Sequence, residues 1–582
     1  METTTSVDFS EIAPYKPRTF LPESVNFNDT EELTHYFKIL LDRPIHSTEE
    51  LNQWLLDRSE LEAAFSQHGA VLYIRMTCQT DDQARAQAYK NFIETVVPAV
   101  KPLGDELNKK YLKERGRFSV DANRYEVYER ALRTDVELFR EDNIPLQTQV
   151  DVLAQEYQTL CGAMTVTFNG KERTLPQMNK FLQEPDRALR ESAWRALSAR
   201  RVKEREKLDG LYDEMLKLRH TIAQNAGCAN FVEYQFRAFH RFDYSPAECK
   251  QYHATIERRA VPLLKEMYRT RRAEMKLGVL RPWDLSVDPL GRPALNPFSS
   301  VEEFLNKTSL VFERLDPELR RQFELLRRER LLDLANRKGR APGGYQQTLA
   351  EARKPFIFMN AVGLNSDVRT LFHECGHAFH ALACAGDELV DYRHAPLEFS
   401  EVASMSMEIL TAPLSNAFYG PGDLKRALRD LWEDIVEILV WVAVVDCFQH
   451  WIYENPAHTA PERAAAWVKI YQRFGSDEVD WSGFDEIRSS IWHRQLHIFE
   501  MPFYYIEYGI AQLGALQLWQ ATLKNPTRTL ANYRRALALG GSKPLPQLYQ
   551  AAGIQFRFDE SVIGPLLDSV RAAWRDIGDS RL

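Results

Sequence analysis

Apolar side chains recur at intervals of three and four residues over much of this 582-residue chain. Residues at that spacing lie on one face of a helix, so the pattern predicts amphipathic helices. The clearest runs are 126–139, 187–222, 424–448 and 504–523. We therefore predict a mainly α fold with a large helical body.

Strand patterns are few. Residues 165–168 and 171–175 flank Asn169-Gly170, a pair that favours a two-residue hairpin turn. Residues 345–352 and 355–362 predict a second antiparallel pair, joined through Arg353-Lys354. The helical body is thus expected to carry a small antiparallel β-sheet, close in sequence to His373.

The charge and cysteine content exclude some classes of protein. The chain has 74 basic and 82 acidic residues and a net charge of -8, which argues against a nucleic-acid partner. Its seven cysteines are an odd number without CxxC spacing, which indicates a reduced, intracellular protein.

No targeting or membrane segment is predicted. The first 20 residues lack a basic-then-apolar signal pattern. The most apolar stretch, 438–445, is far shorter than the roughly 20 residues that span a bilayer. We expect a cytoplasmic protein without a membrane partner. We divide it into an N-terminal helical region, 1–190, and a second region, 191–582, which the motif described next predicts to be catalytic.

The segment from His373 to His377 reads His-Glu-Cys-Gly-His. On a helix, residues four apart lie one turn above each other, so both imidazoles can face one metal ion. Glu374 lies beside that face and can reach a water molecule without binding the metal. Residues 365–367, Asn-Ser-Asp, are expected to cap the helix at its start.

A third metal ligand must come from another segment. Residues 393–408 predict a second helix on which Glu398, Glu401 and Glu408 recur at helical spacing. Spacing alone does not choose among these three glutamates. His380, one turn beyond the first pair, is a rival ligand, although a buried, hydrogen-bonded histidine is the alternative interpretation.

Zinc is the expected metal because it accepts imidazole and carboxylate ligands. Three protein ligands leave one coordination position for water, as in catalytic zinc sites. Zinc lowers the pKa of such a water toward about 7, and Glu374 can take its proton as general base. The expected reaction is peptide-bond hydrolysis.

Several short sequence motifs resemble those of the thimet oligopeptidase and oligoendopeptidase F superfamily of zinc peptidases. Within this superfamily, the chain resembles the oligoendopeptidase F and Pz-peptidase branch most. The motifs are Pro-Phe-Ile-Phe-Met-Asn at 355–360, the metal motif at 373–380, Glu-Phe-Ser-Glu-Val-Ala-Ser-Met-Ser-Met-Glu at 398–408, the aromatic stretch 497–512 and Gly-Gly-Ser at 540–542. The resemblance spans roughly residues 165–554, and the first 120 residues carry little of it.

The resemblance implies the residue roles that spacing leaves open. It makes Glu401 the third metal ligand, and Glu408 a partner that orients a histidine ligand. It also implies that His497, Tyr505 and Tyr508 bind substrate and the developing oxyanion, with Tyr504 as a competitor for Tyr505. The implied cofactor is one zinc ion per chain.

The implied activity is that of a metalloendopeptidase acting on short unfolded peptides. The family fold is a long helical body with zinc deep in a channel or cavity, and the protein is expected to be a monomer or small homo-oligomer. Strand 355–362 is expected to pair with the substrate backbone. A zinc carboxypeptidase, a catalytically silent peptide-binding protein and a purely structural zinc site are the alternatives.

Overall fold

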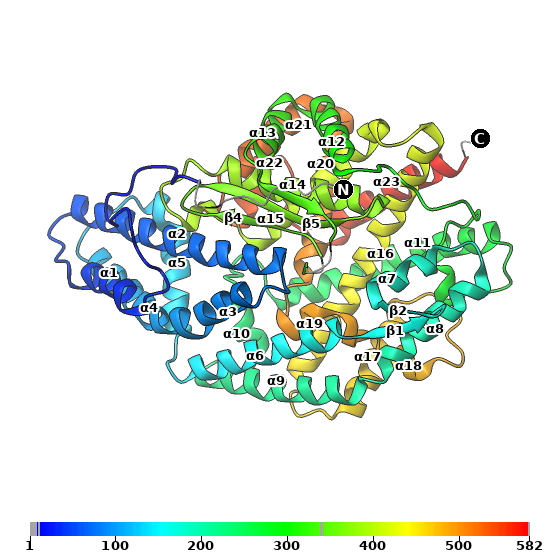
Figure 1. The fold of residues 1–582 in the computed structure, drawn as a ribbon, viewed down its shortest axis with the longest axis horizontal. Helices are drawn as coiled ribbons and strands as arrows, with labels where there is room; N and C mark the ends of the chain where they lie inside the picture. Colours follow the sequence, from blue (N-terminus) through cyan, green and yellow to red (C-terminus); the bar gives the residue numbers. More distant parts are fainter. Residues whose placement is uncertain (1–8, 10–11, 338–339, 342, 580–582) are drawn as a thin grey trace. The chain divides into compact units, whose positions relative to one another are not determined.

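The computed structural model describes residues 9, 12–337, 340–341 and 343–579, so half of the 20-residue N-terminal stretch tested for a signal pattern lies outside the described residues. Helices dominate the described chain, as predicted (Figure 1). The chain forms two compact units, each assembled from segments that are distant in sequence. The first unit comprises 1–139, 296–428 and 511–556, and the second comprises 140–295, 429–510 and 557–582. The division at residue 190 stays a prediction.

The first unit contains the N-terminal helices and the segment around His373. Its helices are α1 (Thr30–Asp42), α2 (Thr48–Cys78), α3 (Gln83–Asn91), α4 (Val97–Arg115), α5 (Ala122–Leu138), α12 (Val301–Leu315), α13 (Pro317–Arg328), α14 (Asn365–Ala383), α15 (Leu397–Thr411), α21 (Pro526–Leu537) and α22 (Leu545–Ala552). Side-chain caps start several of them. Ser47, for example, accepts a hydrogen bond from the backbone N–H of Glu50 at the start of α2.

A three-stranded sheet in the first unit lies beside α14 (Figure 1). Its strands are β3 (Leu332–Ala335), β4 (Tyr345–Leu349) and β5 (Lys354–Ala361), in the order β3-β5-β4. The predicted antiparallel pair is β4 and β5, with Arg353 at a φ of 55° in the turn between them. The third strand, β3, pairs in parallel with β5 and was not predicted.

The second unit is a separate helical body with a small hairpin. Its elements are α6 (Asn143–Gly162), β1 (Thr165–Phe168), β2 (Lys171–Thr174), α7 (Leu175–Asn179), α8 (Arg187–Val202), α9 (Arg205–Asn225), α10 (Phe231–Ala238), α11 (Pro246–Glu274), α17 (Ala460–Phe474), α18 (Asp485–Ser489), α19 (Leu496–Glu500) and α23 (Glu560–Asp579). The predicted hairpin is confirmed: Asn169 and Gly170 both have positive φ, at 52° and 71°.

Two long helices contribute residues to both units. They are α16 (Pro421–Glu454) and α20 (Ile506–Lys524), which match the predicted runs 424–448 and 504–523. Among the described residues, α16 is the one helix long and apolar enough to cross a membrane, and 72% of its most apolar 18-residue window is buried. Core helices of soluble proteins meet the same criterion, and the predicted segment 438–445 lies within α16.

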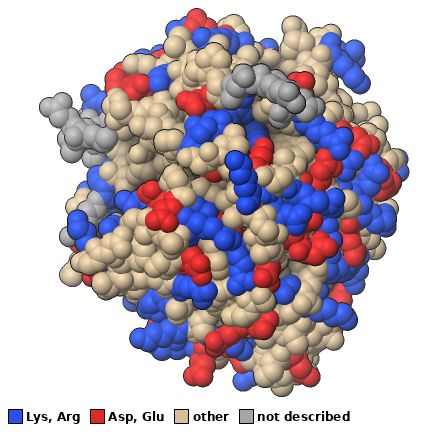
Figure 2. Space-filling view, turned by 90° about the vertical axis from the view of Figure 1, so that its right-hand side faces the viewer, with Lys and Arg blue, Asp and Glu red and all other residues tan. Residues whose placement is uncertain are grey.

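Basic and acidic side chains lie interspersed over the face shown in Figure 2. This distribution agrees with the small net charge of -8. All seven cysteines are free in the structure.

Candidate metal centre

Helix α14 places His373 and His377 one turn apart. Its start is held by Asp367, whose Oδ2 accepts hydrogen bonds from the backbone N–H groups of residues 362, 363 and 364 at 2.7, 2.8 and 2.9 Å. The predicted capping segment thus supplies the acceptor, from the first turn of the helix. The two imidazole rings lie 4.9 Å apart between centroids.

Glu401 on α15 brings its carboxylate to both imidazoles. Its Oε2 lies 3.4 Å from Nε2 of His373 and 3.6 Å from Nε2 of His377. Two nitrogen or oxygen ligands, each about 2.1 Å from a tetrahedral zinc ion, are separated by about 3.4 Å. These three side chains therefore have the spacing of a zinc site.

The other candidate third ligands lie outside this group. Of the described residues, the cluster that could hold a metal ion on α14 and α15 consists of His373, His377 and Glu401. His380 is buried, and its ring packs against Phe399 at 6.0 Å between centroids. Glu398 is also buried, in the first turn of α15.

Hydrogen bonds orient the three side chains of the cluster. Oε1 of Glu408 lies 2.7 Å from Nδ1 of His373, as the resemblance implied. Ser404 donates to Oε2 of Glu401 at 2.8 Å, and Oγ of Ser400 lies 3.4 Å from Nδ1 of His377. Contacts on Nδ1 leave Nε2 of each ring facing Glu401, which is the usual arrangement around a bound metal. The two serines were not predicted.

Gly376 allows α14 and α15 to approach closely enough for this cluster to form. A Cβ atom at Gly376 would lie 2.5 Å from both the carbonyl oxygen of Ala403 and Cα of Ser404. No larger residue fits without moving the helix that carries Glu401. A glycine inside an otherwise regular helix is a sequence sign of such close packing.

The Gly-Gly-Ser motif at 540–542 packs against the loop that leads into α15. Gly540 has a φ of +49°, and a Cβ there would lie 1.9 Å from the carbonyl oxygen of Tyr392. A Cβ at Gly541 would lie 2.3 Å from the carbonyl oxygen of His394. The N–H of Gly541 donates a hydrogen bond to the carbonyl oxygen of Tyr392 at 3.0 Å. These glycines have a packing role in placing α15.

Burial and charge act in opposite directions on the glutamates. Burial raises the pKa of Glu374 to about 7, although His373 opposes this shift. Burial would also raise the pKa of Glu401, but His377 and His373 together lower it to about 2. Burial lowers the pKa of His377 to about 4. Burial would also lower the pKa of His373, but Glu401 and Glu408 together raise it well above its ordinary value. Metal binding at this cluster would therefore displace a proton from His373.

The sheet contributes a strand edge near Glu374. A Cβ at Gly344, just before β4, would lie 3.9 Å from Oε1 of Glu374. The sequence-based expectation that strand 355–362 pairs with a substrate is wrong, because β5 is the central strand and its neighbours occupy both of its edges. The edge strand on the Glu374 side is β4.

His497, Tyr504, Tyr505 and Tyr508 form an aromatic cluster within the second unit. The ring of His497 lies 5.6, 5.1 and 5.7 Å from the rings of the three tyrosines, in that order. The hydroxyl oxygen of Tyr508 lies 3.5 Å from Nε2 of His497. Nε2 of Gln495 lies 2.9 Å from Nδ1 of His497. Tyr505 is 7% exposed, and Tyr504 and Tyr508 are more exposed.

A buried ion pair fixes the backbone that carries these tyrosines. Arg241 and Glu507 pair at 2.7 Å with side chains 0% and 1% exposed. Arg241 also donates to the carbonyl oxygen of Phe503 at 2.6 Å. Phe503 has a φ of 67°, a conformation that costs free energy in a residue with a side chain. The ion pair therefore stabilises the entry to α20. Arg241 and Glu507 were not predicted as part of the site.

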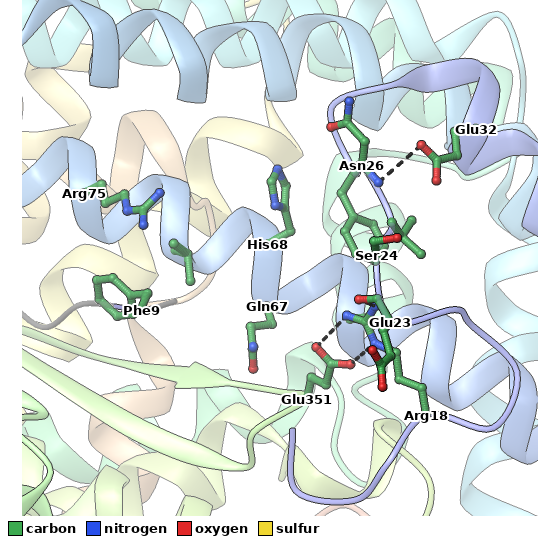
Figure 3. Close-up of a pocket in the computed structure, with 14 residues that line it drawn as sticks. Phe9, Arg18, Glu23, Ser24, Asn26, Glu32, Gln67, His68, Arg75 and Glu351 are labelled. Carbon is green, nitrogen blue, oxygen red and sulfur yellow. Dashed lines mark hydrogen bonds and ion pairs between the residues drawn. The ribbon is translucent and has the colours of Figure 1, made fainter. Parts of the chain in front are cut away.

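Separate cavities occur within each unit. One of about 720 Å³ in the first unit lies between the N-terminal segment and α2. Figure 3 shows Arg18 and Glu351 pointing toward one another at its margin, where they form an ion pair of 2.6 Å. A second cavity, of about 1090 Å³ in the second unit, is lined by residues of α16, Trp441 and Glu437 among them. Neither cavity is lined by a predicted site residue.

Paired imidazoles, a carboxylate from a second helix and a buried glutamate beside them define the class of metal-dependent peptidases with a His-Glu-x-x-His helix. The model of peptidase family M3 matches residues 180–564, and that of the peptidase M3 N-terminal domain matches residues 20–139. The chain belongs to peptidase family M3. The match at residues 20–139 extends the similarity to the family into the N-terminal region, where the sequence motifs show little of it.

Individual relatives agree with this assignment. The chain is 22% identical over 434 residues to an oligoendopeptidase F homologue of Borreliella burgdorferi, covering 72% of each chain. It is similar to a solved structure of PZ peptidase A with an inhibitor, at 28% identity and a TM-score of 0.88, over 96% of this chain and 99% of that one. An oligoendopeptidase F structure from Bacillus anthracis has 26% identity and a TM-score of 0.84, over 96% and 98%.

Proposed function

We propose that this M3 peptidase is a zinc-dependent oligopeptidase that hydrolyses internal bonds of short, unfolded peptides. One observation carries the proposal: Nε2 of His373 and Nε2 of His377 lie 3.4 and 3.6 Å from the same oxygen of Glu401. That spacing suits one zinc ion per chain bound by three residues, with room for further ligands. The alternative carboxylates, Glu398 and Glu408, are not proposed as metal ligands.

When bound, zinc would supply a Lewis acid that activates water and polarises the scissile carbonyl. Glu374 would receive the proton of the attacking water and deliver it to the leaving amine. Its burial supports this role, because a pKa raised to about 7 allows the carboxylate both to accept and to return a proton near neutral pH. Glu408 would hold the tautomer of His373.

His497, Tyr505 and Tyr508 would bind the substrate and donate hydrogen bonds to the oxygen that becomes negative. One such donor commonly contributes about 3 kcal/mol to stabilisation of the transition state. Their mutual contacts support joint action, and the greater exposure of Tyr508 favours it over Tyr505 as the direct donor. Tyr504, which stacks on His497, remains the competitor for Tyr505.

The proposed substrates are peptides that can adopt an extended backbone. An extended peptide can add to the edge of a sheet, and β4 is the edge strand next to Glu374. The deep channel that the family resemblance implies stays a prediction. We further propose a cytoplasmic enzyme, monomeric or a small homo-oligomer, without nucleic-acid or membrane partners. The seven free cysteines support a reducing compartment.

Substitution of Glu374 by Gln tests the proposed chemistry. We expect Glu374→Gln to keep about one zinc at this site and to lose at least about 10²-fold in kcat for an internally quenched peptide, because an amide cannot accept the proton. Metal analysis and peptide turnover are measured on the same preparation. The control is Glu313→Gln, an exposed glutamate of the same unit. Normal turnover by the Glu374 variant would falsify the assignment.

A further inference from the structure

Two helices of the second unit each contribute a pair of chemically reactive residues, four positions apart. Helix α11 carries Cys249 and His253, and helix α16 carries Asp446 and His450. Residues at this spacing lie on the same face of a helix. The ligand atoms of Cys249, Asp446 and His450 all lie within 4.8 Å of one another. We name this group the α11–α16 cluster.

All four residues are buried, with exposures of 1% for Cys249, 3% for His253, 0% for Asp446 and 3% for His450. His253 contacts Asp446 directly, with Nε2 to Oδ2 at 2.7 Å. Aromatic rings enclose His450, and Phe503 lies 5.1 Å from it between centroids. The cluster therefore lies in a buried region, where charged groups need partners.

Several polar atoms of the cluster lack a hydrogen bond. Among the described residues, Oδ1 of Asp446 and both ring nitrogens of His450 have no hydrogen-bond partner. Such buried, unsatisfied groups are rare in proteins because each costs about 1–3 kcal/mol. A bound cation would satisfy the carboxylate and one nitrogen together.

The spacing of the atoms fits a tetrahedral ion. Nε2 of His450 lies 3.5 Å from Oδ2 of Asp446. The expected separation is about 3.4 Å for two nitrogen or oxygen ligands of zinc, and about 3.6 Å when one ligand is sulfur. The ligand atoms all lie within 4.8 Å of one another, so closing on an ion needs a contraction of no more than about 1 Å for any pair.

We propose that the α11–α16 cluster binds a second divalent transition-metal ion of the zinc type, through Cys249, Asp446 and His450. His253 holds the carboxylate of Asp446 in place by its hydrogen bond to Oδ2. A thiolate and a carboxylate neutralise the two positive charges of the ion, so binding leaves no net charge buried. The thiol proton and any proton on His450 are released to solvent.

We infer a structural role for this site, with the fourth coordination position left to a buried water. No residue of the cluster is shared with the His373 group, and the two groups belong to different units. Burial of all the ligands leaves no exposed position for a substrate. The ion would join α11 to α16 within the second unit, where α16 precedes the segment that carries His497 and the tyrosines.

The competing state is a buried ion pair without metal. Burial alone would lower the pKa of His450, but Asp446 raises it to about 11. In this metal-free state, the positive charge of a protonated His450 would balance the ionised carboxylate of Asp446 in place of the metal ion. In that state Cys249 stays a thiol, because burial raises its pKa to about 11. The two states differ in whether sulfur is bound to metal.

Cobalt substitution separates the two states in the full chain. The His373→Ala, His377→Ala double variant removes the ligand pair of the proposed catalytic site. We expect it to retain one Co²⁺ per chain and to show the near-ultraviolet charge-transfer band of a thiolate-bound cobalt ion. Adding Cys249→Ser should abolish the band, whereas Cys228→Ser, which changes another buried cysteine of the same unit, should retain it.

Absence of the band in the double variant, or its survival in Cys249→Ser, overturns the proposal. Wild-type protein gives a second measurement that does not depend on the folding of variants. X-ray absorption at the zinc edge should show about one sulfur ligand for every two zinc ions, and an N/O-only spectrum also overturns the proposal. Peptide cleavage by that same wild-type sample shows that the catalytic assignment survives such a failure.

Discussion

At the scale of single residues, the candidate site depends on groups that bind no metal themselves. Glu408 and Ser404 each hydrogen-bond to one member of the His373 cluster, at 2.7 and 2.8 Å. Such contacts fix ring orientation and ligand basicity, so losing them weakens metal binding. The proposed role of Glu374 as general base depends on its burial as well as on its carboxylate, because burial is the largest contribution to its raised pKa.

We expect Glu408→Gln to weaken zinc binding by about 10- to 100-fold, because the amide is a poorer partner for Nδ1 of His373. Zinc affinity is measured by competition with a chelator that has a visible signal. Glu313→Gln, far from any histidine ligand in sequence and exposed, should leave the affinity unchanged. An unaltered affinity in Glu408→Gln would show that the 2.7 Å contact does not support the metal site.

At the scale of secondary-structure elements, the packing of α14 on α15 brings the ligands together. Contact at Gly376 sets the separation of these helices, and Gly540 with Gly541 places the loop before α15. The small sheet lies against the same helix. The candidate metal site is therefore sensitive to larger side chains at these glycines, although none of them is a metal ligand.

We expect Gly376→Ala to destabilise the protein by about 1–3 kcal/mol, as overpacked cores do, and to lower its zinc content. Gly104→Ala is the matched control, because Gly104 also lies inside a helix but a Cβ there meets nothing within 4 Å. Thermal unfolding and metal analysis check both variants. Equal behaviour of the two would mean that α14 and α15 tolerate a wider separation.

Helix α16 carries a glutamate whose titration links stability to pH. Burial raises the pKa of Glu437 to about 7, with Asp434 adding to the shift. The folded state therefore keeps a proton that the unfolded state loses, and this contribution to stability falls as pH rises from about 4.5 to 7. Glu437 is half-buried on a cavity wall, so water screens it and the effect stays below about 3 kcal/mol.

We expect Glu437→Gln to remove the loss of folding stability that Glu437 causes as pH rises. Its unfolding midpoint should rise relative to wild type at pH 8 and match wild type near pH 5, because the amide carries no proton to release. Chemical unfolding at both pH values is the measurement. Glu214→Gln, which changes an exposed glutamate on α9, serves as the control. A pH-independent difference between Glu437→Gln and wild type would contradict the assigned pKa.

At the scale of the whole molecule, two compact units are each built from three separate segments. The proposed metal ligands belong to the first unit, and His497 with its tyrosines belongs to the second. Substrate size and the position of the cleaved bond are therefore measured on the intact chain.

We expect the intact protein to cleave unfolded peptides of roughly 5–20 residues whose two ends are chemically blocked, and to leave folded proteins intact, as the family resemblance implies. Mass spectrometry of the products gives the cleaved bonds. Treatment with chelator should abolish cleavage, and added zinc should restore it. Inactivity on blocked peptides, with release of single C-terminal residues from free ones, would instead identify a carboxypeptidase.

Local sequence patterns determined much of this protein. The predicted helical runs became helices, with 187–222 divided into α8 and α9. Asn169-Gly170 formed its tight turn, and the spacing of His373 and His377 placed both rings on one face of α14. These features depend on neighbours a few residues apart, which a sequence displays directly.

Only the tertiary structure decided which distant groups meet. Spacing could not choose among Glu398, Glu401 and Glu408, because all three recur on one helix. In the structure α15 packs closely on α14 at Gly376, with Oε2 of Glu401 3.4 Å from Nε2 of His373 and Oε1 of Glu408 2.7 Å from Nδ1 of the same ring. The central position of β5 and the meeting of α11 with α16 likewise depend on contacts between segments far apart in the chain, which no local pattern contains.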